Sequence, residues 1–209
     1  MYIRNFARRA ALAGATVTAA LALAACGGGD HSTAGSGHDM PAAGTSAAGA
    51  SASFGDADVM FAQLMIPHHG QAVEMAELAE TRAADPELRK LAAQIKAAQA
   101  PEIATMTGWL RAWGRPAPSA SGGHGMPGMG HGMPGMMSSD DMAELAAASG
   151  ADFDRQFLTM MIAHHEGAIT MAKDDLAQGA YPDAKALAQQ IVTAQQGEID
   201  TMKKLLGRL

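Results

Sequence analysis

One stretch of this 209-residue chain occurs twice, and each copy contains two adjacent histidines. Phe61 precedes His68-His69 in the first copy, and Phe157 precedes His164-His165 in the second, 96 positions later. The flanking apolar and small residues match at the same offset, and they recur every three or four positions. That spacing is the period of an amphipathic helix. A helical unit that is copied once restricts the chain to folds in which two such units pack together.

The repeat continues through a second helix in each copy, and a short helix is expected before the second copy. We predict helices over residues 56–83, 85–113, 139–148, 152–178 and 182–206. Asp56 and Asp85 are the expected N-caps of the first two helices, and Gly150 is expected to end the short one. Because one αα-hairpin cannot bury its own apolar stripe, two hairpins predict an all-α four-helix bundle.

The N-terminus predicts export with a lipid anchor. Three arginines precede an apolar segment over residues 10–22, which is too short to span a membrane. Leu23-Ala24-Ala25-Cys26 resembles a bacterial lipobox, which implies cleavage before Cys26 and lipidation of its thiol. An ordinary signal peptide with an incidental cysteine is the alternative. We expect the mature chain at the outer face of a bacterial membrane, in the periplasm or on the cell surface.

Composition divides the remaining chain into a tether and a repeated domain. Residues 26–53 are rich in Gly, Ala and Ser, which predicts a disordered tether after the signal peptide of residues 1–25. The bundle is expected over residues 54–209. It comprises repeat 1 over 54–113, a linker rich in Met, His and Gly over 114–138, and repeat 2 over 139–209.

Charge and cysteine content narrow the possible ligands. Removal of the signal peptide changes the net charge from −6 to −9, because that segment carries three arginines and no acidic residue. An acidic chain is a poor ligand for nucleic acid, whose phosphates require a basic surface. Cys26 is the only cysteine, so its lipidation excludes disulfides and thiolate metal sites. A soft-metal site in this chain must therefore use methionine and histidine.

The repeated histidines lie among methionines, which together form a ligand set for copper or for another soft or borderline metal such as silver. The side chains of adjacent helical residues point about 100° apart, so the two histidines of a pair cannot face the same point. Buried, hydrogen-bonded histidines and core-filling methionines are the alternative. The candidate bundle ligands are His68, His69, His164, His165, Met65, Met75, Met161 and Met171.

Each partner helix carries Gln, Glu and Met at positions i, i+3 and i+7, on one stripe. These residues are Gln99, Glu102 and Met106 in repeat 1, and Gln195, Glu198 and Met202 in repeat 2. A carboxylate on an apolar stripe is costly to bury alone, so a metal or a histidine of the neighbouring helix is expected to bind it. Exposure at the edge of the stripe is the alternative. Pro101 and Gly197 at equivalent positions predict a helix defect beside each glutamate.

The linker contains a second group of candidate ligands in a seven-residue repeat. Methionines in a segment rich in Gly and Pro have no packing role, and mobile thioethers and imidazoles can surround Cu(I) or Ag(I). Compositional drift of a linker is the alternative. The candidate linker ligands are His124, Met126, Met129, His131, Met133 and Met136.

The motif Phe-x3-Met-Ile-x-His-His-x2-Ala-x2-Met-Ala, followed by Gln-x2-Glu-Ile-x2-Met-x2-Trp-Leu, resembles the bacterial family long called domain of unknown function 305. The first copy matches from Phe61 to Leu110, and the second from Phe157 to Leu206 with Leu205 in place of the tryptophan. The resemblance covers about residues 54–209. It implies a ferritin-like four-helix fold and a role in copper binding and tolerance.

The favoured interpretation is a non-enzymatic, lipid-anchored protein outside the cytoplasm that sequesters Cu(I) or Cu(II), or passes it to an unknown partner protein. A ferritin-like di-metal oxidase is the enzymatic alternative. That chemistry usually draws on four carboxylates and two Glu-x-x-His motifs, whereas this chain offers one candidate glutamate per repeat. A metal-free helical interaction module is the third possibility.

Overall fold

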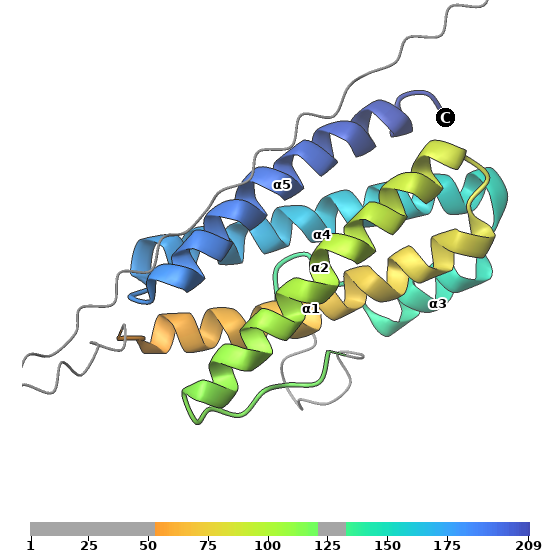
Figure 1. The fold of residues 1–209 in the computed structure, drawn as a ribbon. Helices are drawn as coiled ribbons and strands as arrows, with labels where there is room; N and C mark the ends of the chain where they lie inside the picture. The colour runs from red at the N-terminus through yellow and green to blue at the C-terminus, as the bar shows by residue number, and fades with distance from the viewer. Residues whose placement is uncertain (1–52, 121–132) are drawn as a thin grey trace, which may run out of the picture. The chain divides into compact units, whose positions relative to one another are not determined.

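The computed structural model describes residues 53–120 and 133–209, and these residues form an all-α bundle, as predicted. Within these residues the four long helices pack lengthwise, and the short helix α3 lies beside α1 (Figure 1). The helices are α1 (Asp56–Arg82), α2 (Pro86–Ala112), α3 (Ser139–Ala147), α4 (Gly150–Gln178) and α5 (Pro182–Leu206). Helix α1 packs along α2, and α4 along α5, while the two hairpins meet mainly through α1 and α4.

The predicted helix boundaries hold to within two residues, but two local signals were wrong. Asp85 does cap α2, because its carboxylate accepts the N–H of Glu87 at 2.7 Å. Asp56 does not cap α1; Gly55 precedes that helix and donates its N–H to Asp58 at 2.6 Å. Gly150 does not end α3 but begins α4, with a φ of +67° that favours glycine.

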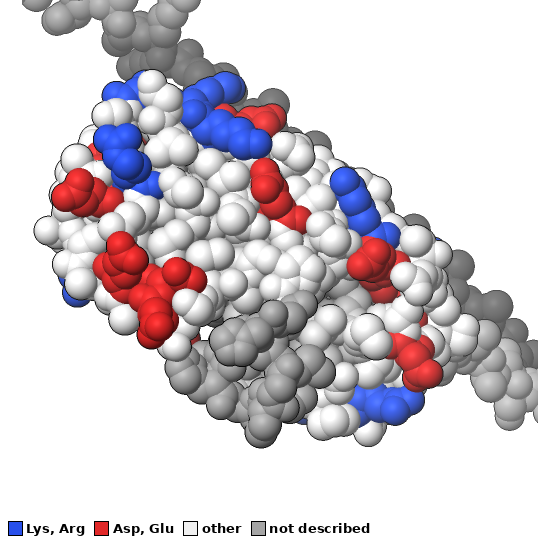
Figure 2. Space-filling view, turned by 180° about the vertical axis from the view of Figure 1, so that it is seen from behind, with Lys and Arg blue, Asp and Glu red and all other residues white. Residues whose placement is uncertain are grey.

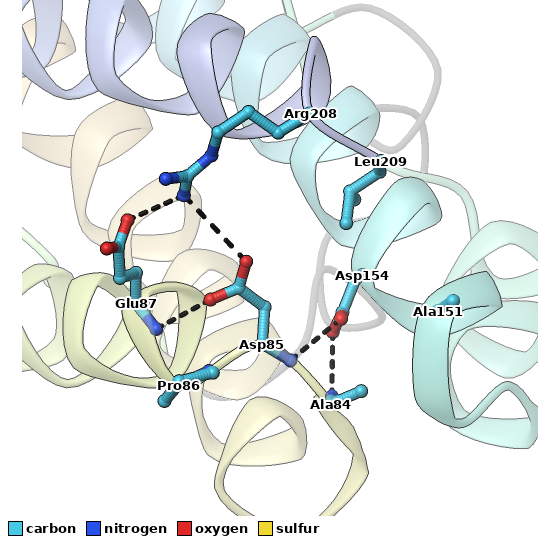
Figure 3. A pocket seen from close by; sticks show the side chains of 8 residues that line it. All are labelled: Ala84, Asp85, Pro86, Glu87, Ala151, Asp154, Arg208 and Leu209. Carbon is cyan, nitrogen blue, oxygen red and sulfur yellow. Dashed lines mark hydrogen bonds and ion pairs between the residues drawn. The ribbon is translucent and has the colours of Figure 1, made fainter.

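Two buried aspartates join the hairpins at their turns. Asp154 of α4 accepts the N–H of Ala84 at 3.0 Å in the α1–α2 turn (Figure 3), and Asp58 of α1 accepts that of Ala180 at 3.1 Å in the α4–α5 turn. Each carboxylate also accepts the N–H of the next residue. Asp58 and Asp154 lie 96 positions apart, as do Ala84 and Ala180, so the two contacts are equivalent in the repeats. Because the start of α1 meets the turn after α4 and the start of α4 meets the turn after α1, these helices run antiparallel and the repeats are related by an approximate twofold axis.

The two ends of the bundle differ although the repeats are related. At one end Trp113 stacks on Phe54 with a centroid distance of 4.6 Å and meets the ring of Tyr181 edge-on at 5.2 Å. At the other end Arg208 pairs with Glu87 beside a hollow of about 410 Å³ (Figure 3). None of the candidate metal ligands that lie within the described residues lines that hollow.

The surface shows no large patch of one charge on the face drawn in Figure 2, where acidic and basic side chains are interspersed among uncharged ones. Among the helices that the structure describes, none combines the length and the apolar composition needed to cross a membrane. The signal peptide, Cys26 and most of the tether lie outside the described residues.

We expect Asp154→Ala and Asp58→Ala each to lower the free energy of unfolding by about 1–3 kcal/mol, because the first change leaves two backbone N–H groups without their acceptor and the second leaves three. Chemical denaturation followed by circular dichroism measures the loss. Asp152→Ala is the matched control, since Asp152 lies in the same helical turn and is exposed. An Asp154→Ala variant as stable as Asp152→Ala would contradict the role of the carboxylate.

Asp175 gives the fold a dependence on pH. Burial, together with the nearby Asp58, raises the pKa of the Asp175 carboxyl from 3.8 to about 6. The folded state therefore binds this proton more tightly than the unfolded chain. The resulting stabilisation is complete below pH 3.8 and is lost as the pH rises through about 6.

Asp175→Asn removes the buried charge, so we expect the variant to exceed the wild type in free energy of unfolding by about 1–3 kcal/mol at about pH 8. The difference should shrink towards about pH 4. Urea denaturation across this range measures it, with the exposed neighbour in Asp174→Asn as control. An equal gain from both variants would show that the burial of Asp175 is not the cause.

Candidate metal centre

The first histidine of each pair meets its counterpart at the centre of the bundle. His68 of α1 and His164 of α4 are fully buried, and their ring centroids are 3.8 Å apart with a 37° angle between planes. The two residues occupy the same position in their repeats, so the contact lies on the approximate twofold axis. The structure thus brings the two His-His motifs together through one histidine of each.

The second histidine of each pair points into its own hairpin. His69 Nε2 lies 2.6 Å from Glu102 Oε2 of α2, and His165 Nε2 lies 2.8 Å from Glu198 Oε2 of α5. Both glutamate side chains are about one-fifth exposed, whereas both histidines are buried. Of the roles considered for these glutamates, contact with a histidine of the neighbouring helix is the one that the structure shows.

The ring nitrogens divide into bonded and free ones. A carboxylate can only accept a hydrogen bond. A neutral His69 or His165 therefore carries its hydrogen on Nε2, which leaves Nδ1 with a lone pair. Within the described part of the chain, none of the four Nδ1 atoms has a hydrogen-bond partner, and His164 Nε2 has none either. Buried nitrogens without partners are costly, and a ligand that accepts their lone pairs would remove that cost.

Burial keeps the central rings neutral. Desolvation, followed by the proximity of His69, lowers the pKa of His68 to about 3. The pKa of His164 also lies well below its ordinary value, owing first to desolvation and then to His68. Metal ions bind the neutral form of imidazole, so both rings are in the binding form at neutral pH.

The six candidate methionines of the bundle are all buried and separate into two groups of three. Each apolar cluster receives one thioether from α1, one from α4 and one from a flanking helix. Met75, Met161 and Met202 belong to one cluster, and Met65, Met106 and Met171 belong to the other. A shift of 96 positions exchanges the two groups. Core filling, the alternative role of Met65, Met75, Met161 and Met171, is therefore confirmed, and the role of all six as ligands stays a prediction.

Two further polar side chains on the same stripes are buried. Gln99 and Gln195 are 2% and 3% exposed. Neither oxygen of these amides has a partner among the described groups. The helix defects predicted at Pro101 and Gly197 stay predictions; each carbonyl accepts the hydroxyl four residues later, at 3.0 and 2.9 Å.

Two of the six candidate linker ligands, Met133 and Met136, lie within the described residues. The other four, His124, Met126, Met129 and His131, lie outside them. Its described C-terminal end reaches the central pair, because the carbonyl oxygen of Pro134 lies 3.0 Å from His68 Nε2. Sequence reasoning missed this contact, and it also missed Gln71, which binds the backbone of Met137.

No three side chains of His, Cys, Asp or Glu gather closely enough to hold a metal ion within residues 53–120 and 133–209. The histidine–carboxylate contacts of the two hairpins are pairs, one in each repeat. A metal that takes three or more ligands at this centre therefore requires thioether ligands or a local rearrangement of the side chains.

A helical bundle of two repeated hairpins, with facing histidines in a methionine-rich core, defines the class of this protein. The family model described as Domain of unknown function (DUF305) matches residues 58–206. The chain belongs to this family, as the paired motif predicted.

Solved structures of the family agree with this assignment. A DUF305 protein from Streptomyces coelicolor, whose name marks it as a candidate secreted protein, is 38% identical with a TM-score of 0.65; the match covers 73% of this chain and 93% of that one. A DUF305 fragment from Deinococcus radiodurans is 37% identical with a TM-score of 0.65, over 74% and 98% of the two chains.

CopM in its Cu(II)-bound form is 37% identical with a TM-score of 0.61, over 72% of this chain and 96% of CopM. CopM has also been solved in Cu(I)-bound and Ag-bound forms. No curated protein matches the chain significantly.

The neutral central rings predict that the metal-free protein loses stability in acid. The unfolded chain takes up protons on His68 and His164 near pH 6.5, whereas the folded state does so only at lower pH. Their contribution is therefore complete above pH 6.5 and is lost as the pH falls towards about 3.

NMR spectroscopy of the metal-free protein tests whether the two rings stay neutral in acid. The Asp175→Asn variant is used because the Asp175 carboxyl has the opposite effect on stability as the pH falls. We expect the His68 and His164 rings to keep the signature of neutral imidazole at about pH 5, because their burial disfavours the charged form. Titration of either ring with a midpoint near 6.5 would contradict the burial of the pair.

Proposed function

We propose that this protein binds copper outside the cytoplasm and sequesters it or transfers it, without catalysing a reaction. The observation that carries the proposal is the contact between His68 and His164, two neutral buried rings with free nitrogens. Buried methionines lie three residues before and seven residues after each of these histidines in the sequence. Imidazole and thioether together favour Cu(I), Cu(II) or Ag(I) over hard cations.

The family supports the choice of metal. CopM carries Cu(I), Cu(II) or Ag in several of its solved forms, and its similarity to this chain covers 72% of the sequence at 37% identity. We infer that the bundle ligands come from the histidines of both repeats, from Glu102 and Glu198, and from the buried methionines. The thioethers and imidazoles of the linker form a second, more adaptable group of ligands.

Export and lipid anchoring at Cys26 belong to the same proposal. The signal peptide of residues 1–25 and the tether of residues 26–53 would place the bundle of residues 54–209 at the outer face of a bacterial membrane, where a partner protein receives the metal. A relative whose name marks it as a candidate secreted protein is consistent with export. Loss of membrane retention in Cys26→Ser would support the anchor, and an unchanged membrane fraction would contradict it.

An oxidase function has less support. The described carboxylates that contact histidine are Glu102 and Glu198, and they lie in different hairpins. Di-iron and di-manganese bundles instead draw carboxylates from all four helices towards one centre. The observed pairs fit ligand positioning better than dioxygen chemistry.

Titration with Cu(I) in competition with a chromophoric chelator tests the function. We expect His68→Leu/His164→Leu to lower the affinity of the bundle site by about 10-fold or more, because both central imidazoles are lost while the core stays apolar. Met65→Leu should weaken binding less, and the exposed Met60→Leu serves as its matched control.

A second variant separates the bundle from the linker. Replacement of the six linker ligands by serine should lower the number of bound Cu(I) ions and leave the bundle site intact. Equal binding by the wild type, the double histidine variant and the linker variant would contradict both proposed sites. Circular dichroism confirms that each variant retains its helices.

A further inference from the structure

We propose that residues 133–137, termed the strap, fix the tautomer of His68 and so select Nδ1 as the nitrogen that it offers to a metal. Gln71 is the positioning residue that holds the strap in place. The identity of the metal rests on the function proposed above, whereas the tautomer is a property of the metal-free protein.

The direction of one hydrogen bond determines the tautomer. The carbonyl oxygen of Pro134 lies 3.0 Å from His68 Nε2 and can only accept, so Nε2 carries the hydrogen. Burial holds the ring neutral, with its pKa lowered to about 3, and a neutral imidazole carries one N–H. Nδ1 is then the nitrogen with the lone pair, and no described group binds it.

Gln71 holds the strap by two hydrogen bonds to one backbone unit. Its Nε2 donates to the carbonyl oxygen of Met137 at 2.9 Å, and its Oε1 accepts the N–H of Met137 at 2.8 Å. The Gln71 side chain is buried, with 6% exposed. Both ends of the amide are satisfied, which fixes the backbone three residues after Pro134.

Two glycines allow the strap to lie directly on α4. A Cβ at Gly167 would lie 2.0 Å from the carbonyl oxygen of Pro134. Gly135 has a φ of +76°, and a Cβ there would lie 2.6 Å from the carbonyl oxygen of Ala163. Any larger residue at either position would displace the strap from the histidines.

The two repeats differ at the position that this arrangement requires. Gln71 and Gly167 occupy equivalent positions, 96 residues apart. Repeat 1 therefore supplies the side chain that binds the strap, and repeat 2 supplies the glycine against which the strap packs. His68 consequently has a hydrogen-bond partner for Nε2 in the strap, whereas the strap makes no hydrogen bond to Nε2 of His164. The central histidines are equivalent by position and distinct by chemistry.

A metal that binds the pair would therefore meet a preset nitrogen on His68, whereas the strap does not set the tautomer of His164. Groups that hydrogen-bond the second nitrogen of a ligating histidine orient the ring and set its tautomer, and their loss weakens metal binding by about 10–100-fold. The strap provides that group for His68 through a backbone carbonyl.

Nitrogen-15 NMR of the metal-free protein tests the inference, because protonated and bare ring nitrogens have distinct shifts. We expect His68 of the wild type to be the Nε2–H tautomer, and Gln71→Ala to give a mixture of tautomers. Gln63→Ala is the matched control, since Gln63 donates to another linker carbonyl, that of Pro116, at 2.9 Å. It should leave the tautomer of His68 unchanged.

Gly167→Ala should also give a mixture of His68 tautomers, because the added Cβ displaces the Pro134 carbonyl without altering Gln71. Circular dichroism shows whether the variant keeps its helices, and Gln71→Ala decides the question if it does not. Titration with Ag(I) should then show an affinity about 10-fold lower in Gln71→Ala than in Gln63→Ala.

An Nδ1–H tautomer in the wild type, or the same tautomer in wild type and Gln71→Ala, would overturn the inference. Lack of Ag(I) binding by the wild type would instead contradict the proposed function. The two failures are distinguishable, because the tautomer is measured before any metal is added.

Discussion

The contact between His68 and His164 is the constraint on which the rest of the centre depends. Two imidazoles at a centroid distance of 3.8 Å, both buried, are tolerated only as neutral rings. They lie where α1 of one hairpin packs against α4 of the other, so they form part of the interface between the repeats. Two groups of buried methionines belong to the two apolar clusters of the core. A polar pair at the centre of an apolar interface suits a ligand that accepts nitrogen lone pairs.

The surrounding contacts keep this interface in register. Asp58 and Asp154 each bind the turn of the opposite hairpin, which sets how far α1 can slide along α4. His69 and His165 bind Glu102 and Glu198 within their own hairpins, so the second histidine of each motif orients its flanking helix. In each His-His motif, the first histidine therefore contacts the other repeat and the second contacts its own hairpin.

The helices and the bundle were predictable because they follow from local periodicity and from an ungapped repeat. The contact of Glu102 with His69 was also within reach, since a carboxylate on an apolar stripe requires a partner. The cap at Gly55, the aspartates that cross between hairpins and the strap were not. Asp58 binds backbone groups more than 120 positions away, and the Pro134 carbonyl is an acceptor that any residue could supply. The only sign of the strap in the sequence is that repeat 2 has Gly167 where repeat 1 has Gln71. That difference can be interpreted only once the linker is seen to pack against Gly167.

Anomalous diffraction from crystals of the silver-loaded protein tests the central claim most directly, because it locates Ag(I) independently of any variant. The account predicts an anomalous peak between α1 and α4, within bonding distance of His68 Nδ1 and of a ring nitrogen of His164. Full silver occupancy elsewhere, with none at these two histidines, would contradict it.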